Sequence, residues 1–505
     1  MRSPLRASAV LSFSLIVTCV GGCSSTPSGP RVAAGVATSA DPATDAATDA
    51  ATDAVADAVA DPRADPRADP RAANVRRIFD EALRRQHAHA LLRELCSVAP
   101  KRLSGSAGAQ RAVTWAEGAM RAAGLEYVRL EPVRAPRWER GDVEKLELLG
   151  VDAGPLAIRA LGGSVATPAG GLEAEVVRVT SFEELAARSA EARGRFVLFD
   201  RPMDRTLPDP FAAYGGAVDQ RSRGAVEAAR AGAVGALVRS MTMAVDDNPH
   251  TGALRYDDTI PRVPGVALST IAADRLARRI ATGEPTRVRL ELDCRTLPDV
   301  DSFNVVGEVR GREAPDEIVL LGGHLDAWDV GEGAHDDGAG CVQTLAAARI
   351  LLDLDLRPRR TLRVCFFMNE ENGLRGGLAY RDTHRDELAR HVLALESDRG
   401  GFVPRGFATD AGPELFARLA TIARLLEPWG ASTLRPGGGG ADIGPLREHG
   451  VPLAEFLPDA ARYFDFHHAD TDVFAAVHPR ELELGAAAIA AFAWCVADEP
   501  ERSTR

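Results

Sequence analysis

Residues 318–326 read IVLLGGHLD, in which four large apolar residues lead into two glycines, a histidine and an aspartate. A second run, Val364-Cys365-Phe366-Phe367, is also apolar without alternation and leads into Asn369-Glu370-Glu371-Asn372. Strands that are buried on both faces of a sheet have this pattern. Apolar residues at helical spacing predict helices at 77–95, 108–123, 338–353, 374–390 and 481–497. Strands that alternate with helices predict an α/β fold with a mainly parallel sheet flanked by helices.

Polar clusters follow the predicted strands, where ligands bind in sheets of this kind. His324 and Asp326 end the first strand, and two residues apart in extended backbone they point to the same side. The other clusters are Asp336-Asp337 at the start of a helix, Asn369–Asn372, Glu396-Ser397-Asp398 after a third strand, and the later segment Phe466–Asp472. Taken alone, each cluster is better explained as a helix cap or a solvated loop.

Taken together, the clusters indicate a metal centre. Converging carboxylates repel one another unless positive charge lies between them, and a pair of metal ions supplies that charge. Zinc accepts a mixed set of nitrogen and oxygen ligands. Two ions bridged by a carboxylate, with an activated water, are typical of hydrolases.

With these motifs the chain resembles the co-catalytic zinc exopeptidases of peptidase family M28, which includes bacterial aminopeptidases and carboxypeptidase Q-like enzymes. The resemblance covers about residues 95–495. The segments that carry it are Arg102–Ser106, His324–Asp329, Asp336–Gly338, Asn369–Leu374, Glu396–Asp398, Asp442–Leu446 and the His467-His468 segment.

The resemblance implies two zinc ions per chain and assigns a role to each ligand. His324 and Asp398 are expected to hold one zinc, and Glu371 and His468 the other. Asp336 is expected to bridge both ions. Glu370 is implied as the general base that takes a proton from the attacking water and passes it to the leaving nitrogen.

The same resemblance gives supporting roles to neighbouring residues. Asp337 is expected to follow Asp336 through a cis peptide and to orient it, and Asp326 to orient His324. His467 stands where many members have a tyrosine that helps to stabilise the oxyanion, so it is a candidate catalytic group. His335 has no role in the family and is expected to face solvent or to lie outside the ligand set.

Residues 146–295 resemble a β-rich protease-associated domain inserted into the catalytic domain. The alternative is an elaborated loop of the catalytic sheet, but 150 residues far exceed a normal connection. The catalytic domain is therefore expected in two pieces, at 75–145 and 296–505.

The N-terminal region is predicted to contain an export signal followed by a tether. Residues 1–22 have the charged and apolar parts of a bacterial lipoprotein signal peptide, and Cys23 follows as the expected lipidation site. The alternative is an ordinary signal peptide with an incidental cysteine. Residues 23–74, rich in Ala, Asp and Pro, are expected to be a disordered tether. These features predict an exported enzyme, anchored by lipid to the bacterial cell envelope, with the outer membrane favoured.

The chain is thus predicted to be a dizinc metallo-exopeptidase that hydrolyses short peptides, as an aminopeptidase or a dipeptidase. A single-zinc amidohydrolase or acyl cyclase and a non-catalytic binding module are the alternatives. With 60 basic and 72 acidic residues and a charge of −12, a nucleic-acid partner is not expected. The expected partners are short peptides, the membrane through the N-terminal lipid, and a second copy of the chain.

Overall fold

The computed structural model describes residues 69–500, which lie within one compact unit of the chain. Cys23, the signal sequence 1–22 and the tether as far as residue 68 lie outside the described residues. Helix α1 (Ala72–Arg85) begins three residues before the predicted start of the catalytic domain at 75. Among residues 69–500, no helix is both long and apolar enough to cross a membrane.

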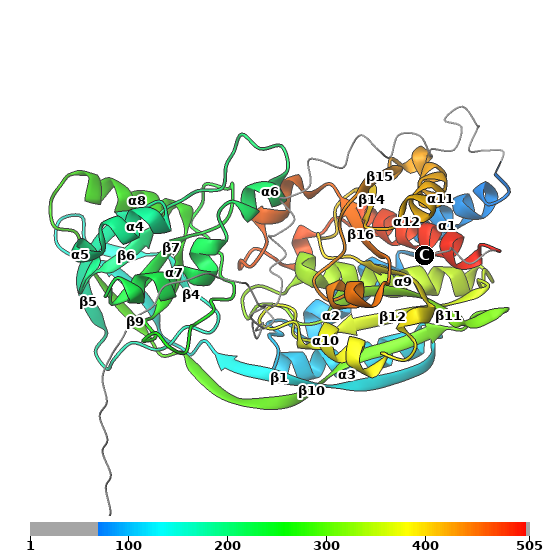
Figure 1. Cartoon of the computed structure of the whole chain (residues 1–505), viewed down its shortest axis with the longest axis horizontal. Coiled ribbons are helices and arrows are strands. Elements are labelled where there is room, and N and C mark those ends of the chain that lie inside the picture. The colour runs from blue at the N-terminus through cyan, green and yellow to red at the C-terminus, as the bar shows by residue number, and fades with distance from the viewer. Residues whose placement is uncertain (1–68, 501–505) are drawn as a thin grey trace, which may run out of the picture. The chain divides into compact units, whose positions relative to one another are not determined.

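The first sheet has eight strands, and the polar clusters follow several of them. Figure 1 shows this sheet packed against helices. Its strands, in spatial order, are β1 (Glu126–Glu139), β10 (Arg295–Val309), β12 (Arg360–Phe367), β11 (Ala314–His324), β13 (His391–Glu396), β16 (Leu453–Pro458), β14 (Pro404–Thr409) and β15 (Thr433–Pro436). The central strands β12, β11, β13 and β16 are parallel to one another. Strands β1, β10 and β14 join antiparallel neighbours, so the sheet is mixed around a parallel centre.

Both faces of this sheet are covered by helices, as continuous apolar strands require. Val319 and Leu321 face the larger core, whereas Leu320 between them faces the smaller one. The helices of the larger core are α1, α2 (His87–Val98), α3 (Ala107–Ala122), α9 (Ala339–Asp353), α11 (Pro413–Arg424) and α12 (Pro479–Asp498). The smaller core is covered by α10 (Arg375–Thr383) and the short helix Gly444–His449.

Two predicted helices differ from the observed ones. A single helix was expected at 77–95, but α1 and α2 are separated by Gln86, whose backbone is left-handed with φ of 54°. The helix expected at 374–390 ends as α10 at Thr383, and a separate turn of helix follows at Leu388–Arg390. Between them, His384 turns inward to contact Glu131 and Glu387.

The long antiparallel strands β1 and β10 lead out of the first sheet and into an insert, here defined as residues 144–292. Its eight strands, in spatial order, are β3 (Gly154–Leu156), β2 (Glu144–Leu148), β9 (Arg287–Leu292), β5 (Leu172–Val179), β6 (Phe196–Phe199), β7 (Gly235–Arg239), β8 (Gly265–Leu268) and β4 (Ile158–Ala160). Strands β5 to β8 are parallel. Two cores consist mainly of insert residues, and each also takes in residues of the catalytic part, such as Trp328 in one and Phe464 in the other.

The insert carries helices as well as strands. They are α4 (Phe182–Ala187), α5 (Ser189–Ala192), α6 (Pro210–Gly215), α7 (Asp219–Arg230) and α8 (Thr270–Ala281). Its sheet coincides with the predicted segment 146–295 to within three residues at each end. That this segment is a protease-associated domain remains a prediction.

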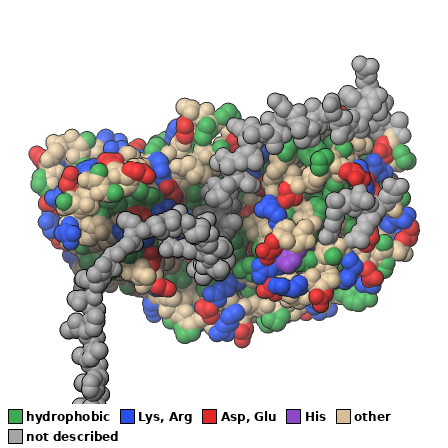
Figure 2. All heavy atoms as spheres, viewed as in Figure 1, with side chains coloured by type: hydrophobic (Ala, Val, Ile, Leu, Met, Phe, Trp, Pro, Cys, Tyr) green, Lys and Arg blue, Asp and Glu red, His purple; other side chains and the backbone are tan. Residues whose placement is uncertain are grey.

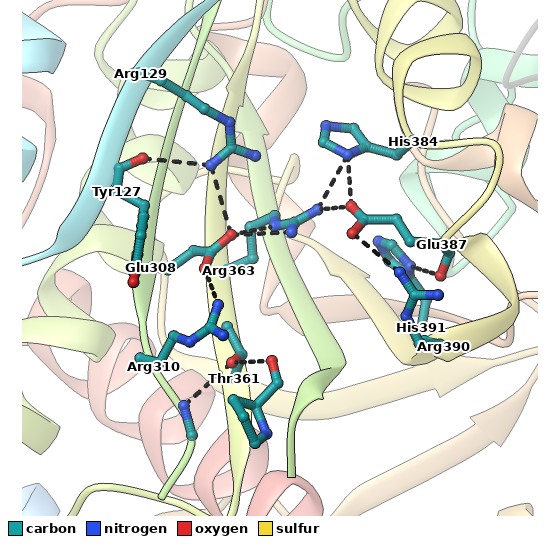
Figure 3. A network of polar contacts seen from close by, with 12 residues as sticks. Tyr127, Arg129, Glu308, Arg310, Thr361, Arg363, His384, Glu387, Arg390 and His391 are labelled. Atoms are coloured by element: carbon teal, nitrogen blue, oxygen red, sulfur yellow. Dashed lines mark hydrogen bonds and ion pairs between the residues drawn. The ribbon is translucent and has the colours of Figure 1, made fainter.

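Charged side chains are interspersed on the surface, and some form a buried network on one side of the first sheet. Figure 2 shows acidic and basic side chains mixed over the face that it draws. On the smaller-core side of the first sheet, the buried guanidinium of Arg363 bonds Glu308 at 2.9 Å and also contacts Glu387 (Figure 3). His384 lies beside Glu387 and bonds Glu131 at 3.0 Å, so this network ties β1, β10 and β12 to the end of α10.

Candidate metal centre

The carboxyl ends of three neighbouring parallel strands bring the first polar side chains together. His324 is the last residue of β11, Glu370 and Glu371 follow β12, and Asp398 follows β13. Strand β11 lies between the other two strands in the sheet. Asp336 comes from the turn before α9.

The five predicted ligands meet in two groups that share Asp336. His324 Nε2 lies 3.2 Å from Asp336 Oδ1 and 3.4 Å from Asp398 Oδ1. His468 Nε2 lies 3.2 Å from Asp336 Oδ2 and 3.0 Å from Glu371 Oε2. One carboxylate oxygen of Asp336 therefore faces each group, which is the arrangement expected of a bridging ligand.

These residues fit zinc. Ligands about 2.0–2.1 Å from a tetrahedral zinc lie about 3.3 Å from one another, close to the observed separations. Asp336 Oδ2 and Asp398 Oδ1 are buried and have no hydrogen-bond partner among the described residues. Buried carboxylate oxygens require a partner, and a cation between the groups would provide one.

The charges of the cluster favour a cation as well. Burial opposes a charge on His324, yet the carboxylates of Asp398 and Asp336 raise its pKa well above the ordinary value. Burial likewise opposes a charge on His468, but Glu371 and Asp336 raise its pKa to about 9. Burial and the carboxylate of Asp336 raise the pKa of Glu371 to about 7. Carboxylates that surround both imidazoles thus create a strongly negative pocket.

Four buried residues hold the ligands in place: Asp326, Asp337, Asp472 and Arg102. His324 Nδ1 lies 3.0 Å from the carbonyl oxygen of Asp326, which directs Nε2 towards Asp336. The Asp326 carboxylate lies 3.9 Å from that ring and instead accepts hydrogen bonds from the backbone N–H groups of Asn369 and Glu370. Asp326 therefore orients His324 through its backbone, and the residues after β12 through its side chain.

Asp337 and Asp472 hold the turn that carries Asp336. The Asp336–Asp337 peptide is cis, as the family resemblance implied. The Asp337 carboxylate accepts hydrogen bonds from the backbone N–H groups of His324 and Gly340, at 3.0 and 2.9 Å. Asp472 accepts from the N–H of His335 at 2.7 Å and of Asp336 at 3.1 Å, a role that the sequence did not reveal.

Arg102 belongs to one of the family motifs, and its side chain is fully buried and supports the site. Its guanidinium donates hydrogen bonds to the carbonyl oxygens of Leu325, Glu332 and Gly333. These residues belong to the loop that links His324 to Asp336. Arginine is almost never fully buried. Its presence within a family motif was the sequence signal that could have revealed this role.

Glu370 lies beside this cluster and is only partly buried. Burial raises its pKa well above the ordinary value, and the nearby carboxylates of Asp398 and Glu371 act in the same direction. A carboxylate with a raised pKa accepts a proton readily, which suits a general base.

The remaining two histidines are buried. His467 stacks on His468 with ring centroids 3.5 Å apart, and its Nε2 lies 3.8 Å from Asp336 Oδ2. This distance is longer than that of any of the other four contacts of the cluster, so Glu371 is the better third member of the second group. His335 stacks on Phe402 instead of facing solvent, and burial lowers its pKa to about 4.

The insert brings a further charged side chain to the centre. Arg221 of α7 lies with Nη1 3.4 Å from His468 Nδ1 and with its Cζ 5.5 Å from the Tyr214 ring centroid. Among residues 69–500 no carboxylate is within ion-pair distance of this buried arginine, and its Nε has no hydrogen-bond partner there. Its position in the sequence, far from every ligand, gave no signal of this placement.

Comparisons with known proteins agree with one another. The model of "Peptidase family M28" matches residues 304–493. Human carboxypeptidase Q is 38% identical over 404 residues, which cover 80% of this chain and 84% of that protein. A solved peptidase M28 precursor from Shewanella amazonensis is 34% identical with a TM-score of 0.83, covering 86% of this chain and 98% of its own. A zinc aminopeptidase from Bacillus subtilis, 20% identical with a TM-score of 0.59, shares the fold over 83% of this chain and 98% of its own.

Proposed function

This chain belongs to peptidase family M28, and we propose that it is a dizinc exopeptidase that hydrolyses short peptides. Its similarity to carboxypeptidase Q over most of both chains supports a zinc-dependent exopeptidase. The observation that carries the proposal is the placement of Asp336, whose two oxygens lie 3.2 Å from His324 and from His468. A single-zinc amidohydrolase would leave one of these two ligand groups without a purpose.

The side chains divide the work of peptide hydrolysis among them. His324, Asp398 and Asp336 would hold one zinc, and Asp336, Glu371 and His468 the other. Zinc held there would polarise the scissile carbonyl and lower the pKa of water towards about 7. Glu370 would accept the proton of the attacking water and deliver it to the leaving nitrogen. His467, whose pKa burial and the neighbouring His468 hold well below its usual range, would be a neutral hydrogen-bond donor beside the reacting carbonyl.

Arg221 favours a substrate with a free carboxylate. The carbonyl oxygen of Thr251 lies 3.2 Å from His468 Nδ1, and since a carbonyl can only accept, this nitrogen carries the hydrogen. Arg221 then cannot donate to the same nitrogen. A buried guanidinium without an acceptor is costly, and the α-carboxylate of a bound peptide would satisfy it.

The positive charge of Arg221 distinguishes between an aminopeptidase and a dipeptidase. An aminopeptidase has no need of a cation next to its metal ligands, whereas a dipeptidase must bind the free carboxylate one residue beyond the scissile bond. We therefore favour substrates with a free α-carboxylate one residue beyond the scissile bond, dipeptides among them. Anchoring through Cys23, the assignment of the insert as a protease-associated domain, and pairing with a second copy remain predictions from the sequence.

Metal removal tests the dizinc proposal. Purified protein is expected to hold two zinc equivalents, to lose hydrolysis of dipeptides on treatment with a chelator, and to regain it as zinc is added back. Full activity at one equivalent would favour the single-zinc alternative. Protein that binds two zinc ions but cleaves no peptide would favour a binding module.

A further inference from the structure

The insert contacts the metal-ligand segment through a short stretch of backbone and one buried histidine. The N–H of Thr251 donates to the carbonyl oxygen of His468 at 2.9 Å. The carbonyl oxygen of Thr251 in turn lies 3.2 Å from His468 Nδ1. His250 Nδ1 lies 2.6 Å from the carbonyl oxygen of His467. Residues 250–251 thus bind both residues of the His467-His468 pair.

The conformation of His468 requires support from outside its own segment. Its φ is 62°, in the left-handed region that residues other than glycine seldom adopt. Such a backbone persists when its surroundings hold it. The hydrogen bond from Thr251 N–H fixes the carbonyl of His468, and the bond to Thr251 O fixes its ring.

The side chain of His250 makes one hydrogen bond among the described residues. It is buried, and its Nδ1 faces a carbonyl, so this nitrogen must carry the hydrogen. Its Nε2 is buried and has no hydrogen-bond partner among the described residues. The single N–H donor of the side chain therefore orients the peptide that joins His467 to His468.

Residues 250–252 are held in place by hydrogen bonds to other parts of the insert. The N–H of His250 donates to Ser240 Oγ at 2.8 Å, and the Thr251 hydroxyl donates to the carbonyl of Ala160 at 2.7 Å. The N–H of Gly162 donates to the carbonyl of Gly252 at 2.9 Å. These bonds attach the stretch to the ends of β7 and β4.

The same part of the insert also touches a residue that is hydrogen-bonded to Glu371. A side chain at Gly162 would lie within 1.9 Å of the Trp328 ring, so the ring packs directly on this glycine. The N–H of Trp328 donates to Glu371 Oε1 at 3.2 Å. Both His468 and Glu371 are therefore linked to the insert, whereas His324 and Asp398 make no hydrogen bond or ion pair with it among residues 69–500.

We propose that the insert positions the ligands of one of the two metals, and that the His250 side chain orients the His467-His468 peptide alongside the backbone of Thr251. This inference rests on the proposed dizinc centre. His250 is a positioning residue that acts through the His467-His468 peptide. Loosening its contact should weaken the metal held by Glu371, Asp336 and His468 and spare the other.

Zinc titration of metal-free protein against a chromogenic chelator tests this without reference to activity. Wild type is expected to bind two equivalents. His250→Leu removes the donor and should weaken one site by about 10- to 100-fold, the usual effect of losing a group that orients a ligand. His250→Asn, whose amide nitrogen can take the place of Nδ1, should restore most of that affinity.

A control separates this effect from general damage to the insert. Leu276 lies in the insert core on α8 and is fully buried. Leu276→Ala should lower the melting temperature and leave both zinc affinities unchanged. Equal loss of affinity in Leu276→Ala and His250→Leu would overturn the specific role of His250.

Three other results would be decisive. Unchanged zinc binding by His250→Leu would overturn the inference alone, whereas fewer than two zinc equivalents in wild type would overturn the dizinc centre. If His250→Leu does not fold, the isosteric pair His250→Asn and His250→Asp carries the test, because the carboxylate cannot donate. Equal zinc affinities in that pair would also refute the role of His250.

Discussion

Replacement of Arg221 by methionine should change which substrates the protein prefers. Methionine keeps much of the apolar length of the side chain and removes its charge. A hydrogen bond to a charged group contributes about 1.5–3 kcal/mol. At about 1.36 kcal/mol for each factor of ten in rate, the lost contact with a substrate carboxylate corresponds to about 10- to 150-fold in kcat/KM.

Comparing wild type and Arg221→Met on two substrates isolates the contact between Arg221 and the substrate carboxylate. The assay measures kcat/KM for a dipeptide and for the same dipeptide with an amidated C-terminus. Wild type should prefer the free acid by about 10- to 150-fold. Arg221→Met should lose that factor on the free acid and change little on the amide, so that the preference disappears. Zinc content should remain at the wild-type value.

Arg223 provides a matched control on the same helix. Its side chain is 59% exposed and pairs with Glu227. Arg223→Met should therefore leave both substrates unaffected. An equal loss on acid and amide in Arg221→Met would mean that Arg221 supports the site in general, and no loss on either would refute its role in carboxylate recognition.

Two other predictions concern the general base and the buried ion network. Glu370→Gln should keep its zinc and lose about 10²- to 10⁴-fold in kcat, measured beside a metal analysis; a variant with near wild-type turnover would show that another group takes the proton. Burial opposes a charge on His384, but Glu131 and Glu387 raise its pKa. A raised pKa stabilises the fold fully below the ordinary value of about 6.5, and that contribution is lost as pH rises through the folded-state pKa. The stability of wild type over His384→Leu in urea unfolding should therefore shrink between pH 6 and 9, and a constant or growing difference would contradict this assignment.

Several elements of the fold could be predicted because their signals are local. The uninterrupted apolar runs of β11 and β12 and the helical spacing of α9 and α12 are visible within 8 to 20 residues. The break at Gln86 was missed because a left-handed residue other than glycine leaves no mark in the apolar pattern. The inward turn of His384 was missed because it depends on Glu131, 253 residues away.

The amino-acid sequence by itself determined the order of strands and helices and the chemical types of the ligands, since periodicity and residue type are properties of short segments. It also pointed to each of the five ligands through a family resemblance. Only the tertiary structure decided that the two oxygens of Asp336 face different histidines, that Arg221 lies against His468, and that the insert holds the His467-His468 peptide. These contacts join residues as many as 247 positions apart, and the packing of the insert against the catalytic sheet brings the last two about.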